Sequence, residues 1–529
     1  MDLRQTVVDS GKKLVERTPL MRIVSDDRVL RVADAVFDAR GRLRAAAGKA
    51  AEAWELLVRG YRLPEIDPAN VEDVPVSRPK SKGNGASVVS VSTESSGAEA
   101  PAAPRAAKGD DDELATSIAS RTSLASLSGR DVFQKCYEFK AVDNARKRGM
   151  YPYFRPLDLN DGPEAVLEGR RVLMFGSNNY LGLTTHPKVR EAAINAIKEY
   201  GTSMTGSRLV NGSMKLHKQF EEKLAAYFNK EAAIVFTTGY QVNIATLAAL
   251  LSNKKTYAVI DKSDHASIYD GVKLGQAVGA RMVRYKHNDA TSLDKVLSEL
   301  ETDDGAFVIT DGVFSAEGEI VHLPEIVEVC KKHKARIFVD DAHALGVIGP
   351  GGKGTAAHFN LNDEVDLYGG TFSKTLASIG GWLVGPRKVL EYIQLFASSF
   401  MFAASAAPPN VAAAMAALEV MQEESWRVDK LRENFTYMRE ELKKMGWDVG
   451  HSETAVIPLY VRQDLRTIMA WKELLDEHGI YTNPFISPGV PPKSACLRTS
   501  YMATHSREQL DRALEAFHKV GKKFGVLER

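Results

Sequence analysis

The sequence predicts an α/β protein built on a mostly parallel β-sheet, with a smaller α+β domain at its carboxyl end. Three observations predict this fold. Short apolar runs typical of buried parallel strands recur between residues 232 and 339. Amphipathic helical stretches separate these runs, and such alternation indicates a sheet covered on both faces. After residue 425 the rhythm changes, and charged helices flank two apolar strands.

Composition excludes several classes of protein. A chain of 529 residues with 44% hydrophobic and 26% charged residues is long enough for two or three domains with a substantial core. A net charge of +1 provides no global basic field for nucleic acid. Cys136, Cys330 and Cys496 are widely spaced and odd in number, which argues against a disulfide framework or a cysteine zinc site. We expect a reducing, cytoplasmic compartment, and the sequence contains no apolar run of membrane-spanning length.

The amino-terminal part is expected to hold two elements before the catalytic region. Residues 1–74 predict a helical module, because apolar positions between about 26 and 63 recur at helical spacing and indicate two amphipathic helices separated near Gly41. Residues 75–118 are rich in Ser, Gly, Ala and Pro and predict a flexible linker. A small core, docking on an acyl-carrier protein and peripheral contact with the inner membrane surface are the alternatives for the helices. Residues 119–170 are expected to form an arm, with one helix over 131–148 and an extended segment over 151–154.

The elements of the two following domains are predicted from apolar periodicity. The large domain, residues 171–425, is expected to contain strands at 171–175, 232–236, 257–260, 281–285, 307–310 and 336–339. Its helices are expected at 186–200, 217–228, 240–251, 268–276, 293–300 and 324–332. The α+β domain, residues 426–529, is expected to contain helices at 428–445, 467–478 and 507–524 and strands at 455–461 and 495–500.

A lysine lies in an unusual setting after a short apolar segment. The run Gly369-Gly370-Thr371-Phe372-Ser373-Lys374 predicts a crowded turn at a strand end. Partial desolvation there lowers the pKa of Lys374, so that a neutral amine is accessible for a Schiff base with an aldehyde. The hydroxyls of Thr371 and Ser373 are placed to hold a phosphate. Taken alone, so short a motif is more often a loop lysine beside a glycine turn.

Predicted strand ends upstream of this lysine deliver the other groups that a pyridine-aldehyde cofactor requires. Such a ring acts as an electron sink while its nitrogen stays protonated, and Asp340 is the natural carboxylate partner. His343, on the same turn, would reach the phenolic oxygen of the ring, and His265 would lie on the ring face. Gly239 and Tyr240 begin a helix, whose free backbone N–H groups form an anion site.

Several stretches together carry a resemblance to a known family. They are 177–182 (SNNYLG), 238–240 (TGY), 263–267 (SDHAS), 311–315 (DGVFS), 339–343 (VDDAH) and 370–374 (GTFSK). From about residue 133 onward the chain resembles the α-oxoamine synthases, which are pyridoxal-phosphate enzymes of the aspartate aminotransferase fold, fold type I. They join an amino acid to an acyl-CoA with loss of CO2. Residues 206–208, 266–271 and 287–289 resemble the serine palmitoyltransferase branch most closely.

The resemblance implies a role for each matched residue. Lys374 would be the Schiff-base lysine and His265 the stacking residue, and both would be catalytic. Pyridoxal 5'-phosphate would contact Gly239, Tyr240, His265, Asp340, His343, Thr371, Ser373 and Lys374. Arg498 would receive the carboxylate of the amino acid, and Asn179 would also bind substrate. The implied partners are L-serine, a long-chain acyl-CoA and a second copy of the chain in a homodimer, and the implied product is the 3-keto base that begins sphingolipid synthesis.

The sequence departs from the family pattern at three places. Asp341 stands where the family usually has Glu, Thr499 replaces a cysteine common in some bacterial members, and segment 402–409 is one residue longer than usual. The last departure leaves the role of Ser405 open.

Three alternative functions have some basis in the sequence. A glycine- or alanine-using synthase with a shorter acyl-CoA remains open, of the 2-amino-3-ketobutyrate CoA ligase, 8-amino-7-oxononanoate synthase or 5-aminolevulinate synthase type. A phosphate-binding loop at residues 349–354 fails, because Val347 and Gly354 stand where that motif needs Gly and Ser or Thr. An inactive scaffold is disfavoured, because every cofactor residue is retained.

Overall fold

The computed structural model describes residues 131–301 and 303–528. The predicted module 1–74 and linker 75–118 lie outside the described residues, as does the first part of the predicted arm. None of the helices in the described ranges combines the length and apolar character that a membrane span requires.

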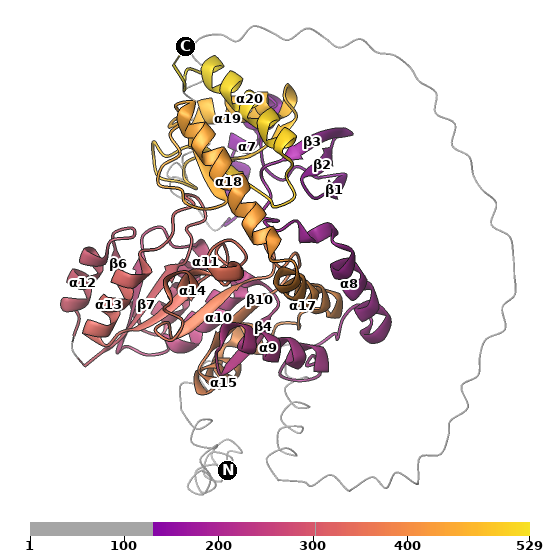
Figure 1. The fold of residues 1–529 in the computed structure, drawn as a ribbon. Helices are drawn as coiled ribbons and strands as arrows, with labels where there is room; N and C mark the ends of the chain where they lie inside the picture. The colour runs from indigo at the N-terminus through magenta and orange to yellow at the C-terminus, as the bar shows by residue number, and fades with distance from the viewer. Residues whose placement is uncertain (1–130, 302, 529) are drawn as a thin grey trace, which may run out of the picture. The chain divides into compact units, whose positions relative to one another are not determined.

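A seven-stranded sheet forms the centre of the large domain (Figure 1). Its strand order is β4-β10-β9-β8-β7-β5-β6, and every neighbouring pair is parallel except those that involve β10. The strands are β4 (Ala232–Phe236), β5 (Thr256–Asp261), β6 (Arg281–Tyr285), β7 (Gly305–Asp311), β8 (Arg336–Asp340), β9 (Leu367–Thr371) and β10 (Gly381–Gly385). The mostly parallel sheet predicted from the sequence is therefore confirmed.

Helices cover both faces of this sheet. Alternate strand residues enter two separate cores, with Val259 in one and its neighbours Ala258 and Ile260 in the other. The longer helices are α8 (Pro187–Tyr200), α9 (Lys215–Phe228), α10 (Gly239–Leu250), α11 (Ala266–Ala277), α12 (Ala290–Ser298), α13 (Leu323–His333), α15 (Arg387–Phe396) and α17 (Pro408–Glu423). Short helices are α14 (Thr355–Phe359) and α16 (Ser398–Met401). The alanine-rich α17 is buried on most sides and packs along α8.

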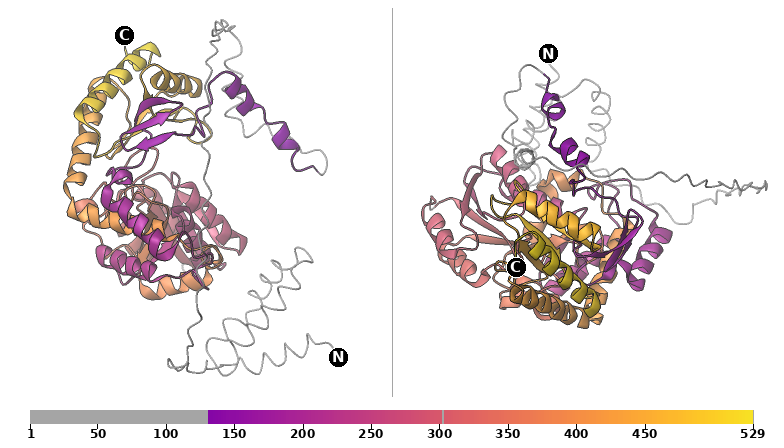
Figure 2. Two further views of the ribbon diagram at one scale, coloured as in Figure 1. Left: turned by 90° about the vertical axis from the view of Figure 1, so that its right-hand side faces the viewer. Right: turned by 90° about the horizontal axis from the view of Figure 1, so that it is seen from above.

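The carboxyl-terminal part contains three helices and a small antiparallel sheet. The helices are α18 (Trp426–Lys444), α19 (Asp464–Asp476) and α20 (Arg507–Lys523), and the sheet order is β11 (Val456–Tyr460), β14 (Cys496–Ser500), β13 (Asn483–Phe485). Figures 1 and 2 show α18 leading from α17 to α19 and α20.

One expected strand belongs elsewhere. We expected residues 171–175 at the start of the large domain, but β3 (Arg170–Met174) pairs with β12 (Ile480–Tyr481) of the carboxyl-terminal part. The other members of this four-stranded sheet are β1 (Leu159–Asp161) and β2 (Glu164–Leu167). Periodicity identifies a strand but does not identify its partner.

Two further expectations differ from the structure. The single helix over 131–148 is wrong, because α6 (Gln134–Tyr137) and α7 (Ala141–Lys147) are separate. Most helical stability in proteins comes from tertiary packing, and α6 has no buried residue. Strand β10 was missed because glycines stand at both its ends, although all five of its residues are buried. There Trp382 stacks on Phe228, with ring centroids 4.3 Å apart.

Candidate active site

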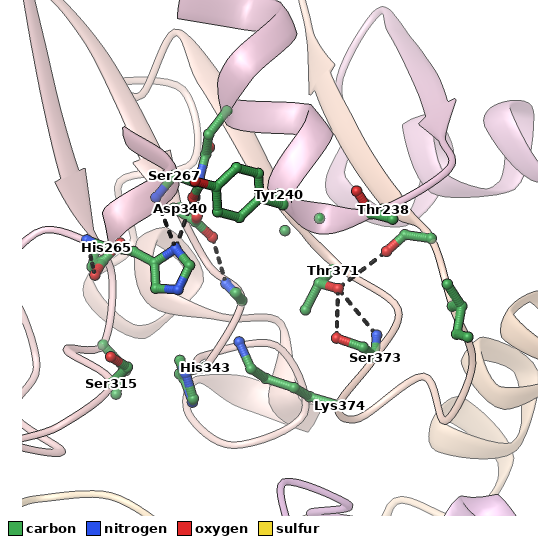
Figure 3. A pocket seen from close by; sticks show the side chains of 18 residues that line it. Thr238, Tyr240, His265, Ser267, Ser315, Asp340, His343, Thr371, Ser373 and Lys374 are labelled. Atoms are coloured by element: carbon green, nitrogen blue, oxygen red, sulfur yellow. Dashed lines mark hydrogen bonds between the residues drawn. The ribbon is translucent and has the colours of Figure 1, made fainter. Parts of the chain in front are cut away.

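A cavity of about 400 Å³ lies at the carboxyl ends of the parallel strands (Figure 3). This is where ligands bind in open α/β sheets. All eight residues expected to contact a cofactor line it, namely Gly239, Tyr240, His265, Asp340, His343, Thr371, Ser373 and Lys374. The structure thus brings together residues that are separated by up to 135 positions in the chain.

Lys374 follows β9 and points into the cavity (Figure 3). Burial lowers its pKa from the ordinary 10.5 to about 8, although the nearby Asp340 carboxylate acts in the opposite direction. Arg498 adds a further lowering effect. A substantial fraction of this amine is therefore neutral just above neutral pH, as the sequence predicted.

The Asp340 carboxylate is held on both of its oxygens. Asn243 donates from Nδ2 to Oδ2 at 2.7 Å, and the backbone N–H of Ala342 donates to Oδ1 at 3.0 Å. Asp340 is only 7% exposed. A fixed, buried carboxylate is what a protonated pyridine nitrogen requires as a partner. The sequence analysis missed Asn243, whose signal is a buried polar side chain within the apolar helix α10.

His265 is fixed at the start of α11. Its backbone N–H donates to Asp311 Oδ2 at 3.1 Å, and its ring Nδ1 lies 2.7 Å from Ser267 Oγ. Burial lowers the pKa of His265, with Asp340 opposing and Lys374 assisting. The imidazole is therefore neutral at pH 7 and suited to lie against an aromatic ring. Ser267 and Asp311 lie within the family-like stretches 263–267 and 311–315, but residue type alone does not indicate that they hold His265.

His343 faces the cavity from the turn after β8. Its Nδ1 lies 2.7 Å from the hydroxyl of Tyr180, which is fully buried. Burial lowers the pKa of His343 well below its usual range, and the charges of Lys374 and Arg498 act in the same direction. A neutral ring at this position is able to exchange a hydrogen bond with a phenolic oxygen.

The expected phosphate site combines hydroxyls with a helix start. Thr371 Oγ1 and Ser373 Oγ are 2.8 Å apart, and α10 begins beside them at Gly239. A Cβ atom on Gly239 would lie 2.5 Å from the Cβ of Thr371, so this close approach requires glycine. Free N–H groups and hydroxyls together suit a phosphate. Tyr240 stands at the rim, 46% exposed, with its hydroxyl bonded to Asp270.

Arg498 lies behind the cavity wall, not among the lining residues that the structure describes. It is 3% exposed, and its Nε donates to the carbonyl of Ser315, which does line the cavity, at 2.6 Å. Both Nη atoms lie 3.1 Å from Asn178 Oδ1. The guanidinium is therefore held by protein acceptors on the side of the cavity that Ser315 covers.

The structure places Asn179 in a different role from the substrate contact implied by the resemblance. Its Oδ1 accepts from the backbone N–H of Leu183 at 3.0 Å, and its Nδ2 donates to Thr184 Oγ1 at 2.8 Å. Asn179 thus caps the short turn that follows, and it does not line the cavity. On this turn it is the preceding residue, Asn178, that contacts Arg498.

One departure from the family pattern, Asp341, has a structural explanation. The Asp341 carboxylate turns away from the cavity and accepts from the N–H and hydroxyl of Thr355 at 2.8 and 2.6 Å. Burial raises the pKa of Asp341 to about 7. A Cβ atom on Gly312 or Gly354 would lie about 2 Å from its oxygens. Gly354 thus leaves room for the Asp341 carboxylate. This close packing explains one glycine of the run 349–354, and no nucleotide-binding role is needed to explain it.

Comparisons with known proteins agree with this site. The family model described as aminotransferase class I and II matches residues 170–517. Serine palmitoyltransferase of Sphingobacterium spiritivorum is 42% identical over 396 residues, which are 75% of this chain and 98% of that protein. The 8-amino-7-oxononanoate synthase of Thermoanaerobacter pseudethanolicus is 37% identical over 387 residues, 73% of this chain and 97% of that protein.

Solved structures lead to the same family. Serine palmitoyltransferase with its pyridoxal-phosphate internal aldimine matches with a TM-score of 0.72 and 32% identity, over 75% of this chain and all of that one. The Sphingomonas wittichii serine palmitoyltransferase matches with a TM-score of 0.71 and 34% identity, over the same shares. Fold and site thus define a pyridoxal-phosphate enzyme of the aminotransferase fold. Within that class the chain belongs to the α-oxoamine synthase family, and it is a pyridoxal-phosphate-dependent acyltransferase.

Proposed function

We propose that the protein condenses L-serine with a long-chain acyl thioester such as palmitoyl-CoA. The products are 3-ketodihydrosphingosine, CO2 and CoA, which makes this the first step of sphingolipid synthesis. The observation that carries the proposal is the single cavity in which Lys374, with its lowered pKa, faces Asp340 and His265. The 42% identity to serine palmitoyltransferases supports the choice of substrates.

The residues of the cavity divide the work of holding the cofactor. Lys374 would hold pyridoxal phosphate through its aldehyde, and the cofactor would supply an electron sink for the bonds broken at the α-carbon of the amino acid. Asp340 would keep the ring nitrogen protonated, with Asn243 fixing the carboxylate. His343 would bind the phenolic oxygen, and Thr371 with Ser373 the phosphate.

Lys374 would also act as the general base. Its Nζ, whose pKa burial lowers to about 8, would take the proton from the α-carbon of serine. The α-carbon bonds to the thioester carbon, the C–S bond breaks and CoA leaves. The carboxylate then departs as CO2, and a proton returns to the α-carbon. His265 would donate a hydrogen bond first to the carboxylate and then to the thioester oxygen.

Arg498 would receive the serine carboxylate. In the described structure its donors are directed to Ser315 and Asn178, so substrate binding would require Arg498 to exchange one of these acceptors for the carboxylate. A planar guanidinium suits this exchange, because its fork matches a carboxylate. The hydroxyl of Ser500, 2.9 Å from Nη1, helps to hold the side chain in place.

The same proposal includes a homodimer in the cytoplasm. Segments 206–212 and 402–409 are joined by backbone hydrogen bonds, including Ser405 N–H to the carbonyl of Gly206 at 3.0 Å. They expose Val210 to 71% and Phe402 to 75%. Such apolar exposure near a cavity supports burial against a second copy. A mass of twice one chain, measured by light scattering, would support the homodimer. An active enzyme with the mass of a single chain would contradict it.

A second candidate is favoured by the 37–38% identity to 8-amino-7-oxononanoate synthases. That enzyme type would use alanine, or glycine in related synthases, with a shorter acyl-CoA. A matrix of amino acids against acyl-CoA lengths, scored by the ketone product, separates the two. We expect the highest kcat/KM for serine with palmitoyl-CoA. A higher value for alanine or glycine with a short acyl chain would overturn the proposal.

A further inference from the structure

A chain of hydrogen bonds along the cavity wall links Asp340 to His265, and both of these residues are labelled in Figure 3. Asn243 Nδ2 lies 2.7 Å from Asp340 Oδ2 and 2.8 Å from Ser267 Oγ. Ser267 Oγ lies 2.7 Å from His265 Nδ1. Asn243 and Ser267 are each 1% exposed, so solvent does not compete for these bonds.

The donor and acceptor at each link follow from the chemistry of the groups. An ionised carboxylate only accepts hydrogen bonds, so the amide NH2 of Asn243, not its oxygen, must face Asp340. The second proton of that NH2 is then directed to Ser267 Oγ. Since the serine hydroxyl has one hydrogen, that hydrogen is left for His265 Nδ1.

A second hydrogen bond to His265 also indicates that Nδ1 is an acceptor. The backbone N–H of Ser267 lies 3.3 Å from His265 Nδ1, and a backbone N–H can only donate. Nδ1 thus accepts from two donors and carries no proton itself. Among the residues that the structure describes, none is hydrogen-bonded to Nε2, and the bonds drawn to the ring in Figure 3 meet at one nitrogen.

We infer that Asn243 and Ser267 are positioning residues that fix His265 as the Nε2–H tautomer and so turn a hydrogen-bond donor toward the amino-acid substrate. The inference rests on the proposed function, in which His265 contacts the substrate carboxylate and then the thioester oxygen. A donor attracts both of these oxygens. The opposite tautomer would present a lone pair to them and would repel the substrate.

The chain also links the two residues that would lie against the cofactor ring. Asp340 orients Asn243, Asn243 orients the hydroxyl of Ser267, and that hydroxyl selects the tautomer of His265. Burial lowers the pKa of His265, with Asp340 opposing and Lys374 assisting. A neutral imidazole has one proton to place, and the hydrogen bonds at Nδ1 decide where it is placed.

The tautomer itself is measurable without turnover. We would record 15N NMR spectra of the pyridoxal-phosphate-loaded enzyme containing 15N-labelled histidine, and assign the His265 signals by their loss in His265→Ala. We expect Nδ1 to resonate as an unprotonated nitrogen and Nε2 as a protonated one. A protonated Nδ1 in the wild-type enzyme overturns the inference, whether or not any variant folds.

Two serine variants test the role of the chain. Ser267→Ala removes the hydroxyl, whereas Ser263→Ala removes a nearby hydroxyl that takes no part in the chain and serves as the control. We expect Ser267→Ala to give a mixture of tautomers and to raise the KM for serine roughly tenfold, which corresponds to about 1.4 kcal/mol. The KM for palmitoyl-CoA should change less than twofold, and Ser263→Ala should change neither value.

The outcomes separate this inference from the proposed function. An unchanged tautomer in Ser267→Ala means that the backbone N–H alone is sufficient, which overturns the role of Ser267 and Asn243. A changed tautomer with an unchanged KM for serine supports the hydrogen-bond chain but overturns the contact between His265 and the substrate.

Discussion

The buried amine of Lys374 should make the cofactor-free enzyme less stable than it would be with a neutral side chain. The pKa of Lys374 is lowered from 10.5 to about 8, so the folded protein binds this proton less tightly than the unfolded chain does. At 1.36 kcal/mol for each pKa unit, holding the charged amine costs about 3 kcal/mol below pH 8. Replacement by methionine, which has a similar length and no charge, should recover most of that free energy.

The sign of the pH dependence follows from linkage. Because the unfolded chain keeps the proton up to pH 10.5 and the folded protein loses it near pH 8, the free energy of unfolding of the wild-type apoenzyme should rise between these values. Lys374→Met should lack this rise. The same variant should be inactive, because it can neither hold the cofactor nor take the α-proton.

Urea unfolding of the apoenzymes at pH 7 and at pH 10 measures both effects. Lys262→Met is the matched control, because Lys262 is exposed on the neighbouring rim, and its stability should stay within about 0.5 kcal/mol of wild type. If Lys374→Met is no more stable than wild type at pH 7, or keeps the same pH dependence, the assignment of a destabilised amine is refuted.

Three further predictions concern other parts of the molecule. Partial burial of His287 disfavours its charge, yet the carboxylates of Asp261 and Glu319, 3.0 and 3.4 Å from its ring nitrogens, raise its pKa to about 10. The folded pKa is above the unfolded value of 6.5, so the stabilisation by His287 should be complete below pH 6.5 and be lost as the pH rises through 10. His287→Gln should therefore lower the free energy of unfolding by about 1–3 kcal/mol at pH 6, as measured by urea unfolding. Asp341→Glu should lower the free energy of unfolding by about 1–3 kcal/mol, because two glycines lie directly against the carboxylate and leave no room for a longer side chain. We expect a lower melting temperature, and an unchanged one would contradict this prediction. Removal of residues 1–118 should leave kcat/KM with free palmitoyl-CoA unchanged, because every residue that lines the cavity follows residue 237. Loss of activity with this donor would show instead that catalysis needs the amino-terminal residues.

Much of the site was predictable because of a general property of parallel sheets. Their strands end at the same edge, so residues that follow successive apolar runs, such as His265, Asp340 and Lys374, meet in space however far apart they lie in the chain. The residues that support them were not predictable in this way. Asn243 lies inside an apolar helix, and its function exists only because α10 packs across β9 and β10 and so brings the amide to Asp340 at the end of β8.

Two neighbouring asparagines show most clearly what the sequence does not predict about the site. Asn178 and Asn179 lie in the same turn and in the same family-like stretch. Asn178 contacts Arg498, whereas Asn179 caps the next turn. A difference of one residue in a turn reverses the direction of a side chain, and neither composition nor spacing reports that direction.

The sequence by itself determined the fold class, the order of the elements and the identity of the groups that line the cavity, because local periodicity and residue chemistry are properties of the chain. Tertiary structure decided which strand pairs with β3, which side chains hold Asp340 and Arg498, how far the pKa of Lys374 is lowered and which nitrogen of His265 carries the proton. These features depend on burial and on contacts between distant segments, and such contacts exist only after the chain has folded.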